Sequence, residues 1–96
     1  MLVVIAYDVN TEDAAGRKRL RKIAKQCVNY GQRVQNSVFE CVLTESQYIM
    51  LKYNLENVID TVEDSVRFYR LGTNWKRKVE TIGKNMGTDV TEELII

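Results

Sequence analysis

The chain begins with an apolar run that stops at Asp8. Residues 2–7 are apolar at both alternating positions, a pattern typical of a central strand whose two faces are both covered. The run is far shorter than a membrane span and lacks the basic start of a signal peptide. We therefore predict a buried first strand with a carboxylate at its end, and no membrane partner.

Two amphipathic helices are predicted next. An acidic, cap-rich start at residues 10–13 leads into the first helix, and Gly31 supplies its stop. The apolar stripe of this helix consists of Leu20, Ile23, Ala24, Cys27 and Val28. A capping box at residues 44–47 begins the second helix. Its apolar stripe consists of Tyr48, Leu51, Leu55, Val58, Ile59 and Val62. Each helix therefore has one apolar face to place against a sheet.

The remaining strands are less regular. Residues 32–43 predict one long strand, although its alternation is imperfect. A bulge near Asn36 or burial of both faces would explain the imperfection. Residues 65–71 alternate cleanly and predict another strand, and residues 79–82 predict a short fourth one.

We take the element order as β-α-β-β-α-β followed by a tail, which predicts an α+β, ferredoxin-like fold with an antiparallel sheet. Residues 1–83 form the domain and residues 84–96 form a C-terminal tail strand that ends in three apolar residues. Both helices cover one sheet face in this fold, so the open face needs a cover. We expect a homodimer through the open face, in which the tail completes the dimer or docks a partner.

Charge is segregated along the chain. The net charge of +1 and the content of 45% hydrophobic and 28% charged residues indicate an ordinary globular protein. Residues 17–25, however, carry Arg17, Lys18, Arg19, Arg21, Lys22 and Lys25, with no acidic residue between positions 14 and 39. This run is either a solvated helix face or a surface that contacts phosphates, and the pattern does not decide between them. A second basic set is interleaved with aromatic residues and consists of Arg67, Arg70, Lys76, Arg77 and Lys78.

Candidate chemistry centres on Asp8. The chain has no histidine, so hydrolysis would need carboxylates, a metal-bound water or both. Asp8 either caps the next turn or, with its copy across a two-fold axis, shares a Mg²⁺ or Mn²⁺ ion between two protomers. Cys27 and Cys41 lack the spacing of metal ligands, and we expect a buried, reduced pair in a cytoplasmic protein.

Several motifs together resemble one family. They are Tyr7-Asp8 at the end of the apolar strand, the arginine-rich helix, the run Gly-Gln-Arg-Val-Gln-Asn-Ser-Val-Phe-Glu-Cys at residues 31–41, and Arg-Phe-Tyr-Arg-Leu at residues 67–71. This combination resembles the CRISPR-associated protein 2 family over nearly the whole chain.

The resemblance implies a homodimer in which the tail strand of one chain extends the sheet of the other. It implies that Asp8 of both protomers is catalytic and holds the metal of an endonuclease acting on double-stranded DNA or single-stranded RNA. It also implies a role in CRISPR adaptation beside an integrase partner. The positions expected to contact nucleic acid are Arg17, Lys18, Arg19, Arg33 and Ser37.

Two other functions stay open. In one, the chain is a non-catalytic platform that bridges DNA in the integrase complex. In the other, it is an unrelated ferredoxin-like module, either RNA-binding or a toxin-type ribonuclease. An RNA-recognition domain needs tandem aromatic residues on its two central strands. The sequence offers only Tyr7 and either Phe68 or Tyr69, which disfavours that module.

Overall fold

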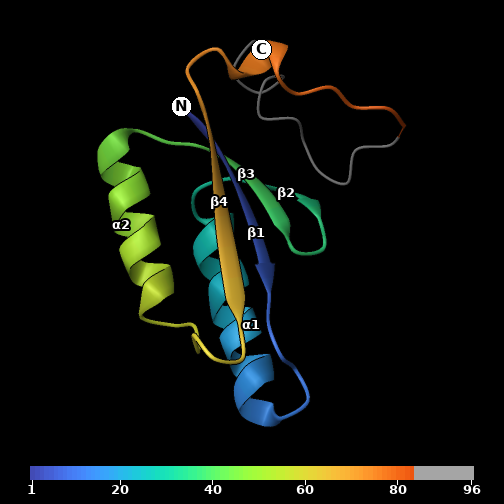
Figure 1. Cartoon of the computed structure of the whole chain (residues 1–96), viewed down its shortest axis with the longest axis vertical. Coiled ribbons are helices and arrows are strands. Elements are labelled where there is room, and N and C mark those ends of the chain that lie inside the picture. Colours follow the sequence, from blue (N-terminus) through green and yellow to red (C-terminus); the bar gives the residue numbers. More distant parts are fainter. Residues whose placement is uncertain (84–96) are drawn as a thin grey trace.

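Four antiparallel strands form one sheet, and two helices pack on the same side of it (Figure 1). A computed structural model describes residues 1–83 of the chain. The sheet order is β2-β3-β1-β4. The elements are β1 (Leu2–Asp8), α1 (Ala14–Val28), β2 (Gln32–Gln35), β3 (Val38–Val42), α2 (Glu45–Glu56), β4 (Ser65–Gly72) and the 3₁₀ helix η1 (Trp75–Arg77). This β-α-β-β-α-β order confirms the predicted ferredoxin-like fold.

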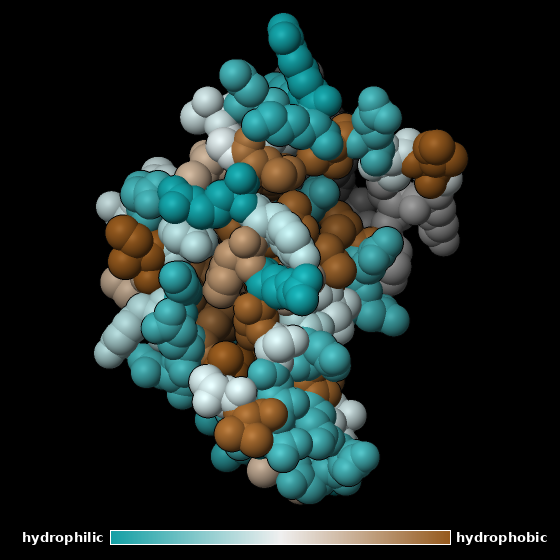
Figure 2. Space-filling model, viewed as in Figure 1, coloured by the Kyte–Doolittle hydropathy of each residue, from teal (hydrophilic) through white to brown (hydrophobic). Residues whose placement is uncertain are grey.

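The core lies between the sheet and the helices. Its buried residues are Val3, Ile5, Tyr7, Ile23, Cys27, Phe39, Cys41, Leu43, Tyr48, Leu51 and Leu55. Val4 and Ala6 belong to the opposite alternation of β1 and are half-buried on the open face of the sheet. Figure 2 views this side and shows apolar side chains interspersed with polar ones in the middle of the surface. The open face thus combines half-buried apolar residues with exposed polar ones such as Arg67, a mixture that another body can cover.

Both predicted helix starts are confirmed. The Asp13 carboxylate accepts a hydrogen bond of 2.7 Å from the Gly16 N–H at the start of α1. Thr44 and Gln47 form the predicted capping box of α2, each side chain accepting from the other residue's backbone N–H. These bonds satisfy N–H groups that have no partner within the helix.

The second helix is shorter than predicted. It ends at Glu56, and Val62, which was predicted to lie in its apolar stripe, is 88% exposed in the turn that follows. The Asp60 carboxylate accepts hydrogen bonds from the backbone of Val62 and Glu63, which stabilises this turn instead of a further helical turn. Val28 is similarly exposed at the end of α1, so its place in the first stripe was wrong.

Two strand predictions were also wrong. Residues 32–43 form two strands, β2 and β3, joined by a tight turn at residues 36–37 rather than one bulged strand. Residues 79–82 are not in a strand, because the fourth strand of the sheet is β4 itself. The predicted tail strand at 84–96 lies outside the described residues. No helix of residues 1–83 has the length and apolar character needed to cross a bilayer.

Gly31 has a different role from the one predicted. Its φ is not positive, so it does not end α1 by a left-handed turn. A Cβ at this position would instead collide with the Glu40 carbonyl and with the Cys41 side chain. Glycine is therefore needed because the chain passes directly against β3. Cys27 and Cys41 are buried and carry no disulfide, so the expected burial of this pair is confirmed.

Candidate functional site

Asp8 is the last residue of β1 and stands opposite Ser65, the first residue of β4. It shares the alternation of Val4 and Ala6, so it lies on the open side of the sheet, where it is exposed. Asp8 does not cap the turn that follows β1. Asp13 is the N-cap of α1, and the Asn10 side chain accepts a hydrogen bond from the Glu12 N–H. Asp8 thus presents a carboxylate at the end of the open face that has no hydrogen bond or ion pair within residues 1–83.

One copy of the chain does not provide a magnesium site. Residues 1–83 contain no group of three or more carboxylate or thiol side chains placed to hold a metal ion. Asp8 contributes a single carboxylate, whereas Mg²⁺ takes six oxygen ligands and keeps several of them as water. The ligand set fits only if a second Asp8 is brought close, so the shared site depends on a second copy.

Ser37 and Arg33 both belong to the hairpin of β2 and β3. The Ser37 carbonyl accepts a hydrogen bond of 3.0 Å from the Tyr7 N–H, which places this turn residue beside the end of β1. Arg33 is in register with Phe39, which faces the helices, and its guanidinium lies 5.1 Å from the centre of that ring. Burial raises the pKa of the Tyr7 hydroxyl, and the Arg33 charge opposes that shift. Ser37 therefore lies beside Tyr7, the residue before Asp8, and Arg33 packs on the helix side.

The outer face of α1 is basic. Its exposed cationic residues are Arg17, Lys18, Arg21, Lys22 and Lys25. The Arg17 guanidinium also donates to the carbonyls of Thr11 and Glu12 at 3.1 and 3.4 Å, which fixes the loop before the helix. This surface lies on the helix layer, away from the open face that carries Asp8. The structure thus separates the expected phosphate contacts from the expected catalytic carboxylate.

Arg19 differs from the other basic residues of α1. Its Nε and Nη2 donate to the two carboxylate oxygens of Asp64 at 2.7 and 3.2 Å. The Arg19 side chain is 19% exposed and that of Asp64 is 0% exposed. The Arg19 guanidinium, followed by backbone N–H groups, holds the pKa of Asp64 below its usual range. Asp64 was not predicted as a site residue, because nothing in the local pattern distinguishes it from the surrounding acidic residues.

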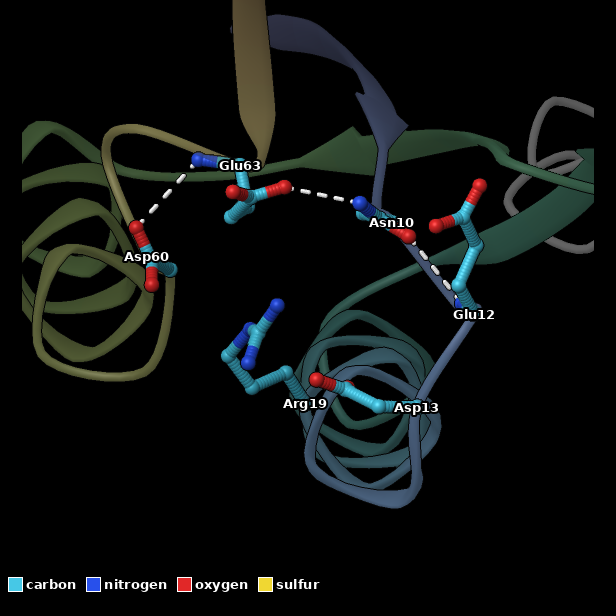
Figure 3. A pocket seen from close by; sticks show the side chains of 6 residues that line it. All are labelled: Asn10, Glu12, Asp13, Arg19, Asp60 and Glu63. Carbon is cyan, nitrogen blue, oxygen red and sulfur yellow. Dashed lines mark hydrogen bonds between the residues drawn. The ribbon is translucent and has the colours of Figure 1, made fainter.

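A pocket adjoins this ion pair. It is lined by Asn10, Glu12, Asp13, Arg19, Asp60 and Glu63. Figure 3 shows the Arg19 side chain reaching into the space between the α1 start and the turn before β4, with acidic side chains around it. The Asn10 side chain donates to Glu63 at 2.7 Å across the same space. The surroundings of Arg19 are therefore acidic, unlike those of the other α1 cations.

Arg67 and Arg70, from the second basic set, lie on opposite faces of the sheet. Arg70 stacks on Tyr48 at 4.7 Å and bonds the Glu45 carboxylate at 2.7 and 2.9 Å on the helix side. Arg67 lies opposite Ala6 on the open face, on the same side of β4 as Ser65. Register therefore brings Ser65 and Arg67 close to the Asp8 end of the sheet, a neighbourhood that the sequence pattern did not reveal.

Comparison with known proteins identifies the family. Residues 1–79 match the family described as CRISPR associated protein Cas2. The chain belongs to the Cas2 family. A "CRISPR-associated endonuclease Cas2" of Halalkalibacterium halodurans is 56% identical over 95 residues, with 99% of each chain covered. A "CRISPR-associated endoribonuclease Cas2" of Chlorobaculum tepidum is 53% identical over the full length of both chains. The predicted family is confirmed, and an unrelated RNA-binding or toxin-type module is excluded.

A solved Cas2 structure supports the same fold. The crystal structure of Streptococcus pyogenes Cas2 at pH 6.5 superposes with a TM-score of 0.76 and 60% sequence identity. The alignment covers 86% of this chain and 100% of the other. The ferredoxin-like arrangement that places Asp8 at the end of β1 is therefore that of a Cas2 domain.

Proposed function

We propose that this Cas2 family member is a nucleic-acid-binding subunit of CRISPR adaptation with metal-dependent endonuclease activity. The relatives' names, endonuclease and endoribonuclease, support the activity. The observation that carries the proposal is the exposed Asp8 carboxylate, which accepts no hydrogen bond within residues 1–83 and ends the apolar open face. Such a carboxylate is available to a ligand rather than used by the fold.

A homodimer through the open face would complete the site. Two copies related by a two-fold axis present the same half-buried apolar residues to each other, including Val4 and Ala6. The two Asp8 carboxylates then repel each other unless a cation lies between them. A Mg²⁺ or Mn²⁺ ion bound there, with waters as its other ligands, would supply an activated water and stabilise charge on the phosphate.

Nucleic acid would bind along the basic surface of α1. Arg17 and Lys18 are exposed there and suit contacts to the phosphates of double-stranded DNA or single-stranded RNA. Arg33 and Ser37 would extend these contacts toward the Asp8 end of β1. Because this surface does not use the open face, binding is compatible with dimerisation. We place the protein in the cytoplasm with a CRISPR integrase subunit as partner.

A second candidate function is a non-catalytic platform that bridges DNA in the integrase complex. It is favoured by the sparseness of the site, which has one carboxylate per chain and no histidine. In that case the basic surface of α1 carries the function, and Asp8 contributes nothing to it.

The test is a cleavage assay on duplex DNA and single-stranded RNA with Mg²⁺ or Mn²⁺. We expect Asp8→Asn to lose cleavage while it retains nucleic-acid binding within about twofold, because amide and carboxylate have the same shape. Glu12→Gln is the matched control, since it removes an exposed carboxylate from the loop that follows β1. Cleavage by Asp8→Asn at the wild-type rate would contradict a catalytic Asp8. Binding without any cleavage by the wild type would support the platform.

A further inference from the structure

Asp64 is the buried charged residue of the described chain, residues 1–83. Its two oxygens accept from Arg19 twice, from the Asn10 N–H at 3.2 Å and from the Asp60 N–H at 2.9 Å. A carboxylate without exposed surface is stable only when donors surround it in this way. These bonds join α1, the loop after β1 and the turn before β4. We call this arrangement the Arg19–Asp64 clamp.

The clamp lies directly beyond the Asp8–Ser65 pair. Asn10 is two residues after Asp8 on one strand, and Asp64 is the residue before Ser65 on the other. The clamp therefore ties together the two chain segments that leave and enter the sheet at this point. Asp8 has no side-chain hydrogen bond of its own within residues 1–83, so its position is set by its backbone alone.

Resting on the proposed nuclease function, we propose that Arg19 and Asp64 are positioning residues for Asp8. The clamp holds the ends of β1 and β4 together, so that the Asp8 carboxylate keeps one place on the open face. Without it these strand ends would fray, as strand ends do when few contacts hold them. A carboxylate that must meet its copy across a two-fold axis depends strongly on such precision.

The same geometry argues against phosphate binding by Arg19. Both carboxylate oxygens of Asp64 already occupy its Nε and Nη2. A phosphate that approached the rest of the guanidinium would also enter a pocket lined by Glu12, Asp13, Asp60 and Glu63. Like charges at this distance repel a phosphate. Arg19 thus acts through Asp64 rather than by touching nucleic acid.

The chain contains a matched control for this proposal. Arg70 and Glu45 form an ion pair of the same chemistry, but its side chains are 47% and 59% exposed. Arg70 lies opposite Val3, toward the other end of β1 from Asp8. Loss of this pair therefore tests what removal of an arginine–carboxylate contact does when Asp8 is not nearby.

The experiment compares Asp64→Asn, Arg19→Gln and their double variant with Glu45→Gln. For each folded dimer we would measure kcat and KM on duplex DNA, Mn²⁺ affinity by titration, and the salt dependence of DNA binding. We expect Asp64→Asn and Arg19→Gln each to lower kcat and Mn²⁺ affinity by about 10- to 100-fold, the usual effect of losing a group that orients a metal ligand. KM and the salt slope should not change, and the double variant should be no worse than either single one.

If Arg19 contacted phosphate directly, the variants would show different kinetics and a different salt dependence of binding. Arg19→Gln would then raise KM and lower the salt slope by about 0.9, as we expect of Lys18→Gln, while Asp64→Asn would not. That result overturns the proposal, as does a kcat of Asp64→Asn equal to that of Glu45→Gln. If Asp64→Asn does not fold, Arg19→Lys replaces it, because lysine keeps the charge and loses the paired geometry.

Hydrogen exchange separates this inference from the nuclease proposal. If the wild type neither cleaves nor binds Mn²⁺, the proposed nuclease function fails. The hydrogen-exchange rate of the Tyr7 amide then tests whether the Arg19–Asp64 clamp holds the end of β1 in place. This amide bonds the Ser37 carbonyl at the Asp8 end of β1. Exchange at least tenfold faster in Asp64→Asn than in Glu45→Gln supports the clamp, and equal rates overturn it.

Discussion

The backbone carbonyl of Asn10 lies where a Cβ on Gly16 would have to stand. Gly16 is buried in the first turn of α1, and its N–H donates to the Asp13 carboxylate at 2.7 Å. The loop that leaves β1 can therefore pass directly over the start of the helix. This close approach places Asn10 within reach of Asp64. A glycine in the helix thus contributes to the position of the strand end that carries Asp8.

Gly16→Ala should destabilise the fold by about 2 kcal/mol, because the new methyl group meets a backbone atom that cannot rotate away. Urea unfolding measures the loss. The neighbouring exposed residue provides a control, and Ala15→Ser should stay within about 0.5 kcal/mol of the wild type. Equal stability of the two variants would show that the loop moves without cost.

Asp64 should contribute stability that depends on pH. Its pKa is lowered in the folded state, chiefly by the Arg19 hydrogen bonds, so the ionised form favours folding. The contribution is fully present above the pKa of the unfolded chain, about 4, and is lost as pH falls through the folded value. Asp64→Ala should therefore cost about 3 kcal/mol at pH 7 and progressively less below pH 4.

Urea unfolding of Asp64→Ala and of the wild type at pH 7, 5 and 3 measures this difference. Glu45→Ala should cost less than about 1 kcal/mol at each pH, since its ion pair is exposed. A difference between wild type and Asp64→Ala that does not change from pH 7 to pH 3 would contradict the role of the ionised carboxylate.

The sequence predicted those parts of the fold that depend on local pattern. The capping box at Thr44 and the strand alternation around Phe68 are both signalled by neighbours in the chain, and both are found. The turn at residues 36–37 was missed, because it lacks the glycine that usually marks a two-residue hairpin turn. Without that signal, residues 32–43 were predicted as one strand instead of β2 and β3.

The site was predictable only in part, because local sequence patterns do not report contacts between residues far apart in the chain. Asp8 is marked by the apolar strand that it ends, so its place at the end of a central strand follows from the sequence. The pairing of Arg19 with Asp64 joins residues 45 positions apart, and no periodicity reports such a contact. Arg19 was therefore grouped with Lys18 by charge, although the fold gives the two residues different surroundings.

Cys27 and Cys41 should be unreactive in the native protein. Burial raises the pKa of each thiol to about 12, so very little thiolate, the reactive form, exists at pH 8. We expect alkylation by iodoacetamide at pH 8 to be roughly a thousandfold slower than for an exposed cysteine. Ser46→Cys supplies that exposed reference on α2. Rapid labelling of Cys27 or Cys41 in native buffer would contradict their burial.

A charge on the open face should break the proposed dimer. Val4 is half-buried in the middle of that face, so Val4→Asp would place a carboxylate in the interface and its copy nearby. Sedimentation at micromolar concentration should then show monomer. Ile49→Asp is the control, because Ile49 is 60% exposed on α2, in the helix layer, and this variant should remain dimeric. A monomeric wild type, or a dimeric Val4→Asp, would contradict dimerisation through the open face.

A divalent cation should stabilise the dimer through Asp8. If the two Asp8 carboxylates meet at the axis, a bound ion removes their repulsion and adds about 2.7 kcal/mol when its concentration is a hundred times its dissociation constant. Asp8→Asn removes both the repulsion and the ligand, so this variant should melt no lower than the wild type in EDTA. It should also gain nothing from Mg²⁺ or Mn²⁺.

Thermal melts of both proteins in EDTA, Mg²⁺ and Mn²⁺ measure these effects, with Glu12→Gln as the control that keeps the response to metal. The shift should be specific to divalent ions, because a site with two carboxylates and several waters binds Na⁺ weakly. An equal rise in Asp8→Asn would mean that the ions screen charge elsewhere on the surface. A wild-type melting temperature indifferent to both ions would leave Asp8 as an exposed strand end, and the basic face of α1 would carry the function alone.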